Sequence, residues 1–194
     1  MCTGKVAKCI GLMLYPLGLT AILANLLLFL PSGVVLGKHE VTDFLWYLHG
    51  FIGAGLLMFF PSSVTLAAGE HGLCANRFGM FCSIIFSSVG ILGAVYCVVI
   101  SALALIGGPL CDTGDGTYSY PFRDDLLQDN YLFDSSLWDI CKHPENVIIW
   151  NIVFFSILLC IGAVEAILCS IQVINGIIGF LCGTGTGTGT GMGN

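Results

Sequence analysis

The chain has 194 residues, of which 56% are hydrophobic and only 9% are charged. A soluble domain of this size usually carries about 25% charged residues, so this composition excludes an ordinary soluble globular protein and indicates a surface that largely faces lipid. The formal net charge is −6, and the six lysines and arginines form no basic patch. A nucleic-acid partner is therefore not expected.

Four long apolar segments follow one another along the chain. A helix that crosses the hydrocarbon core of a bilayer needs about 20 apolar residues. The segments that meet this requirement are residues 10–30, 44–68, 78–106 and 147–182. Helices are the only structure that satisfies the backbone in lipid over runs of this length, because the runs are too long for barrel strands. The predicted fold is an all-α bundle of four transmembrane helices.

The segments between these helices differ in length and charge. We expect a short N-terminus at 1–9, two short connections at 31–43 and 69–77, a large loop at 107–146 and a tail at 183–194. The large loop carries eight acids against two bases, which accounts for the whole net charge of −6. The tail alternates Gly and Thr, a low-complexity pattern that predicts disorder.

Basic residues near the helix ends predict the orientation in the membrane. Lys5 and Lys8 precede the first helix, and Arg77 lies in the second connection, whereas Lys38 lies on the opposite side. The positive-inside rule places both termini and the 69–77 connection in the cytosol, and the large acidic loop outside the cell.

Two of the ten cysteines, Cys111 and Cys141, fall in the large loop. An isolated pair in an extracellular loop predicts a disulfide, with two free thiols as the alternative. Closing a loop of this length stabilises the fold by roughly 3–4 kcal/mol on the chain-entropy estimate.

Five other cysteines lie near the predicted cytosolic ends of the helices, where S-palmitoylation is typical and packing at the interface is the alternative. They are Cys2, Cys9, Cys74, Cys82 and Cys182.

Several short motifs, spread over residues 1–183, are similar to those of one membrane family. They are Met-Cys-Thr-Gly-Lys-Val-Ala-Lys-Cys at 1–9, Ala-Asn-Leu-Leu-Leu-Phe-Leu-Pro at 24–31, Gly-Pro-Leu-Cys at 108–111, Leu-Trp-x-x-Cys at 137–141, Trp-Asn at 150–151, Phe-Ser-Ile-Leu at 155–158 and Ile-Gln-Val-Ile-Asn-Gly at 171–176. The chain resembles the four-transmembrane L-six family, the tetraspanin-like relatives of the tumour-associated L-six antigen. It departs from that family in having no Asn-x-Ser/Thr sequon and only Cys74 in the 69–77 connection.

The resemblance implies a multi-pass membrane adaptor, most often at the plasma membrane, with endosomes as the alternative. Such an adaptor associates laterally with receptors, integrins or tetraspanins, or with copies of itself, and modulates adhesion, proliferation and migration. The other function considered is a transporter, channel or small-ligand sensor with a cavity near Glu165, since an ionisable residue inside a span is a candidate functional site. Structural hydrogen bonding is the alternative role of Glu165, which we expect in the cytosolic half near the depths of Ser62, Ser63, Thr65 and Ser83.

Further polar and small residues inside the spans are candidates for helix contacts. Asn25 and His49 are expected to form a structural hydrogen-bonded pair across the bundle, with a ligand-binding pair as the alternative. Small residues at helical spacing are candidate packing positions within the bundle or against a partner: Gly162, Ala166, Ser170, Gly90 and Ala94. The chain has no catalytic or phosphate-binding motif and no calcium-loop spacing, so we predict no enzyme activity, no cofactor and no metal.

Overall fold

The fold is taken from a computed structural model, which describes residues 3–30, 43–47, 49–69, 77–114, 116–122, 131–132, 134–143 and 146–182. Its long helices are α1 (Thr3–Leu28), α4 (Arg77–Gly107) and α5 (Val147–Cys182). The remaining span, Gly50–Gly69, is built from the π-helix η2 (His49–Leu56) and α3 (Leu57–Gly69), and the short helix α2 (Asp43–Trp46) precedes it. Four helical segments are long and apolar enough to cross a membrane. The predicted all-α fold with four membrane spans is therefore confirmed.

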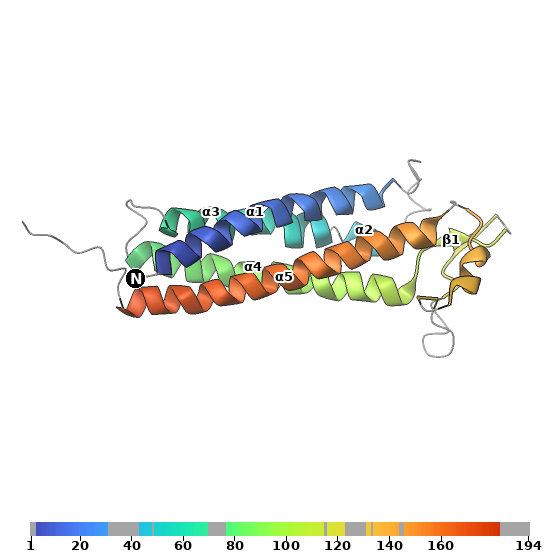
Figure 1. Cartoon of the computed structure of the whole chain (residues 1–194). Helices are drawn as coiled ribbons and strands as arrows, with labels where there is room; N and C mark the ends of the chain where they lie inside the picture. Colours follow the sequence, from blue (N-terminus) through green and yellow to red (C-terminus); the bar gives the residue numbers. More distant parts are fainter. Residues whose placement is uncertain are drawn as a thin grey trace, which may run out of the picture.

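The long helices run side by side along one axis, with the start of α1 and the end of α5 at the same end (Figure 1). We call this the terminal end, and the opposite end, where β1 lies, the loop end. Helix α4 packs along α5, α1 packs against both α3 and α5, and α3 completes the bundle by packing on α4. Each helix thus has two helical neighbours.

The π-helix η2 allows the second span to approach its neighbours closely. A Cβ atom added to Gly53 would lie 2.7 Å from the carbonyl oxygen of Gly93 on α4. A Cβ atom added to Gly50 would lie 3.0 Å from the Cβ of Asn25 on α1 and 2.6 Å from a methyl carbon of Leu158 on α5. Glycine permits backbone contact here because it has no side chain, which is how helices approach closely in lipid.

Two clusters of buried apolar side chains fill much of the bundle interior toward the loop end and in the middle. One cluster of buried side chains occupies the loop half and includes Leu28, Leu45, Phe155 and Leu158. A second cluster, in the middle, includes Leu14, Met58 and Ala94. Large apolar side chains also cover the outside of every span, Leu92 being 71% exposed, as expected for surfaces that contact lipid rather than water.

The described part of the large loop folds into a small domain at the loop end. Strands β1 (Cys111–Asp112) and β2 (Tyr118–Ser119) pair antiparallel, and the 3₁₀ helix η3 (Ser135–Ile140) follows them in the chain. The Asp134 carboxylate caps η3 by accepting hydrogen bonds from the backbone N–H and the hydroxyl of Ser136, which lowers the pKa of Asp134. We call this unit the loop domain.

Candidate functional sites: the loop domain and the buried polar residues

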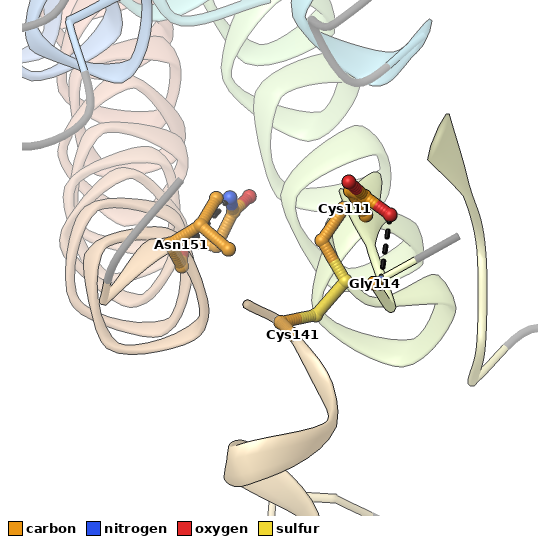
Figure 2. The surroundings of a disulfide bond; sticks show 6 residues. Cys111, Gly114, Cys141 and Asn151 are labelled. Atoms are coloured by element: carbon orange, nitrogen blue, oxygen red, sulfur yellow. Dashed lines mark hydrogen bonds between the residues drawn. A yellow bond between two sulfur atoms is a disulfide. The ribbon is translucent and has the colours of Figure 1, made fainter. Parts of the chain in front are cut away.

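Cys111 and Cys141 form a disulfide, with their Cα atoms 5.5 Å apart, so the predicted bond is confirmed. Figure 2 shows the bond joining the segment that leaves α4 to the segment that leads into α5. Beside it, the backbone N–H of Asp112 donates to the carbonyl oxygen of His143 at 3.0 Å, and the carbonyl of Asp112 accepts from the N–H of Lys142 at 2.9 Å. The covalent bond and these hydrogen bonds hold the two ends of the large loop together.

Tyr131 attaches the loop domain to the end of α4. It is fully buried, its ring stacks on Phe122 with the centroids 4.6 Å apart, and its hydroxyl donates to the carbonyl oxygen of Leu105. That carbonyl belongs to the last turn of α4, where backbone carbonyl groups have no hydrogen-bond donor within the helix. The indole N–H of Trp138 donates to the carbonyl of Tyr131 at 2.8 Å. Burial raises the pKa of the Tyr131 phenol, which stays neutral and keeps donating.

A cavity of about 350 Å³ opens between η3 and the first turn of α5. It is lined by residues from both elements and from the segment between them: Trp138, Asp139, Cys141, Lys142, Asn146, Val147, Ile148 and Ile149. The ammonium of Lys142 extends toward Gly114. This cavity lies at the loop end and therefore far from Glu165, which is in the middle of α5.

The structure describes the side chains of only two of the predicted acylation sites, Cys9 and Cys82. The thiol of Cys9 is exposed on α1, and that of Cys82 is half-buried on α4. Cys2 and Cys74 lie outside the described residues. The side chain of Cys182, at the end of α5, is likewise not described.

Glu165 is completely buried, and neither carboxylate oxygen has a hydrogen-bond partner. It lies at the centre of α5, eighteen residues after Val147. Ser83 instead contacts Gln172, about two helical turns nearer the terminal end. The structure therefore does not bring Glu165 and Ser83 to the same depth.

Asn25 is also fully buried, and neither its amide nitrogen nor its carbonyl oxygen has a partner. The side chain of His49 lies outside the described residues, so the expected pair with Asn25 stays a prediction. Within the described part of the chain, no group of three His, Cys, Asp or Glu side chains is placed to hold a metal ion.

The predicted small-residue positions lie mainly between α4 and α5. A Cβ atom added to Gly162 would lie 3.1 Å from the carbonyl oxygen of Ala94, and one added to Gly90 would lie 3.0 Å from the sulfur of Cys169. Ala166 is half-buried, and the exposed hydroxyl of Ser170 donates to its carbonyl oxygen at 2.7 Å. This geometry favours packing within the bundle for Gly162, Gly90 and Ala94.

Several buried polar residues were not singled out in the sequence, and three of them lie in the terminal half of the bundle: Ser87, Gln172 and Asn175. All three are at most 8% exposed. Helical spacing is the signal that identifies them. Gln172 and Asn175 lie seven and ten residues after Glu165 on α5, and Ser87 lies four residues after Ser83 on α4.

Comparison with known proteins identifies the family. The family model described as L6 membrane protein matches residues 1–186. Transmembrane 4 L6 family member 4 of Mus musculus is 45% identical over 193 residues, which cover 94% of this chain and 93% of the relative. Member 1 of Homo sapiens is 40% identical and member 5 of Homo sapiens 39%, each covering 94% of this chain and 95% of the relative. No solved structure gives a significant match. This chain therefore belongs to the L6 membrane protein family.

Proposed function

We propose that this protein is a tetraspanin-like, non-enzymatic membrane adaptor. It associates laterally with receptors, integrins or tetraspanins and thereby modulates adhesion, proliferation and migration. The observation that carries the proposal is the loop domain, which a disulfide closes and Tyr131 attaches to α4. A domain fixed to its helices presents one defined surface to a neighbour, at a low cost in conformational entropy on binding.

The proposed orientation places the terminal end in the cytosol and the loop domain outside the cell, at the plasma membrane. Lys5 and Lys8 are both exposed on the first turns of α1, where basic side chains favour the cytosolic leaflet. The disulfide supports the same orientation, because structural disulfides persist in oxidising compartments.

The proposal includes S-acylation at the cytosolic boundary. Cys9 is exposed on the same face of α1 as Leu12 and Met13, which are also exposed. An acyl chain on this thiol extends into the adjoining lipid, where it adds apolar contact with neighbouring membrane proteins. Cys82 is the corresponding candidate on α4.

Co-purification of the full chain in mild detergent tests the adaptor function. The test variant is Ile140→Asp, which changes an exposed apolar side chain on η3, and the matched control is Thr117→Asp, an exposed position near β2. We expect a membrane receptor to be recovered with the wild-type chain and the control, and to be reduced with Ile140→Asp. Recovery of no membrane partner by a wild-type chain that reaches the cell surface would refute the adaptor function.

A further inference from the structure

Buried polar side chains lie at intervals along the bundle from the terminal end toward Glu165. We call this set the polar column; it consists of Asn175, Gln172, Ser83, Ser87 and Glu165. Every member is at most 8% exposed, although all lie within membrane-spanning helices. Buried polar groups in lipid are rare and costly, so an aligned set of five requires an explanation.

Hydrogen bonds join the part of the column nearest the terminal end. The side-chain amide of Asn175 donates to the backbone carbonyl of Thr3, at the start of α1, at 2.9 Å. It also donates to the side-chain carbonyl of Gln172 at 3.3 Å. Gln172 in turn donates to the hydroxyl of Ser83 on α4 at 3.2 Å. The column therefore begins where α1, α4 and α5 meet, beside the exposed Lys5.

Helical spacing continues the column to the middle of the bundle. Ser87 lies one turn beyond Ser83 on α4, is fully buried, and its hydroxyl has no partner. The sulfur of Cys169, which lies between Gln172 and Glu165 on α5, sits 3.0 Å from the position of a Cβ atom on Gly90, the next turn of α4. Ser87 is thus placed between the bonded part of the column and Glu165. Ten residues of helix separate Asn175 from Glu165, a rise of about 15 Å.

The loop half of the bundle contains no comparable column among its described residues. Its interior is the apolar cluster that includes Phe155, Leu158 and Ile161. Its buried polar side chains are Asn25, Ser101 and Asn151, and none of the three bonds to another. Ser101 reaches only the sulfur of Cys97, at 4.0 Å, Asn151 donates to the carbonyl oxygen of Val147 on its own helix at 3.3 Å, and Asn25 has no partner. Among the described residues, hydrogen bonds therefore join three buried polar side chains in series only on the terminal side of Glu165.

The surroundings of Glu165 favour a neutral carboxylic acid, because a buried charge needs a partner that this site lacks. The described titratable groups facing it are two thiols, Cys97 on α4 and Cys169 on α5. The described inward-facing side chains of α1, η2 and α3 contribute no titratable or charged group. Hydroxyl and amide side chains both donate and accept hydrogen bonds, so the column can hold a chain of water when the helices separate briefly.

We propose that Glu165 is a proton-binding site that exchanges its proton with water at the terminal end, through the polar column, and is closed toward the loop end. The proton that leaves the carboxyl group passes to this water and leaves a carboxylate, and the same water returns it. This inference goes beyond the proposed adaptor function and does not depend on it. It also differs from transport, because the route ends at Glu165.

Infrared spectroscopy of the full chain in lipid nanodiscs tests the proposal. We expect a C=O stretching band of a protonated carboxylic acid at neutral pH, which shifts when the sample is transferred to D₂O. The isosteric variant Glu165→Gln removes the band, whereas Asp134→Asn, at an exposed carboxylate of the loop domain, leaves it unchanged. Absence of the band in the wild-type protein, or its persistence in Glu165→Gln, would overturn the proposal.

A matched pair of substitutions on α4 tests the route. Ser87→Ala removes a hydroxyl of the column, and Ser101→Ala removes an equally buried hydroxyl on the loop side of Glu165. Loss of one hydrogen-bonding group along the route is expected to slow deuterium exchange by about tenfold in Ser87→Ala. Ser101→Ala should exchange at the wild-type rate. Equal slowing in both variants, or slowing only in Ser101→Ala, contradicts a route from the terminal end.

Discussion

Replacing Gly93 by Ala tests a close backbone contact between the second span and α4. A Cβ atom on Gly93 would lie 2.7 Å from the carbonyl oxygen of Gly53, and a Cβ atom on Gly53 would lie 2.7 Å from the carbonyl oxygen of Gly93. Ordinary contact begins near 3.4 Å, so η2 and α4 have to separate by about 0.7 Å in either variant. The atom in the way is backbone in both cases, which means that no side-chain rotation relieves the clash.

The expected cost follows from two opposing effects. Overpacking a close-packed interior costs about 1–3 kcal/mol, and a clash with backbone belongs at the upper end of that range. Ala is a better helix former than Gly by up to about 1 kcal/mol, which offsets part of the loss. We therefore expect Gly93→Ala to lower the free energy of unfolding by about 2 kcal/mol.

Unfolding of the purified chain in mixed micelles, with increasing SDS and circular dichroism as the signal, measures this change. Gly4→Ala is the matched control, because the nearest atom to its added Cβ lies 3.8 Å away, and it should be neutral or slightly stabilising. The double variant of Gly53 and Gly93 should cost clearly less than the sum of the two single variants, because the first substitution already separates the helices. If Gly93→Ala is as stable as Gly4→Ala, the steric reasoning is wrong.

Further predictions concern the loop domain and acylation. Cys111→Ser should destabilise the loop domain by about 3 kcal/mol, measured as faster cleavage of the loop by added protease while the membrane spans stay intact. Tyr131→Phe leaves the carbonyl of Leu105 without its donor and should lower the thermal midpoint by an amount equivalent to about 1–3 kcal/mol. Burial raises the pKa of the Tyr131 phenol, so its contribution to the stability of the loop domain is complete below the ordinary phenol pKa, near 10. This contribution is lost as the pH rises through the higher pKa of the folded protein. A loop domain that is equally stable at strongly alkaline pH contradicts this pH dependence. Cys9→Ser should remove an acyl group in a thioester-exchange assay, whereas Cys160→Ser, an exposed thiol far from the terminal end, should not.

The number of spans and the disulfide were predictable because each follows from the order of residues along the chain, without knowledge of how the helices pack. Apolar length alone identifies a span, and Cys111 and Cys141 are the cysteines of the only long polar loop. The interruption of the second span was not predictable in the same way. Residues 44–68 contain no Asp, Glu, Lys or Arg, and their composition does not separate α2 from the π-helix η2. The π-helix depends instead on how closely the glycines of η2 approach other helices.

The side of each helix that points into the bundle was harder to predict from the sequence. In water, a buried face is more apolar than an exposed one, but in lipid both are apolar, so hydropathy does not show which side of α5 points inward. Glu165 could be recognised as an inward-facing residue because it is charged. Its depth relative to Ser83 could not be predicted, because that depth depends on the register of α4 against α5, which the contact between Gln172 and Ser83 shows.

The disulfide that closes the loop domain also has a mechanical consequence. It connects the chain directly after α4 with the chain directly before α5, the two helices that share the largest contact in the bundle. Tension applied to the loop domain by a bound neighbour is therefore divided between two helices rather than one. Since Tyr131 also bonds to the last turn of α4, the loop domain is held to that helix at a second point and cannot turn freely about the disulfide.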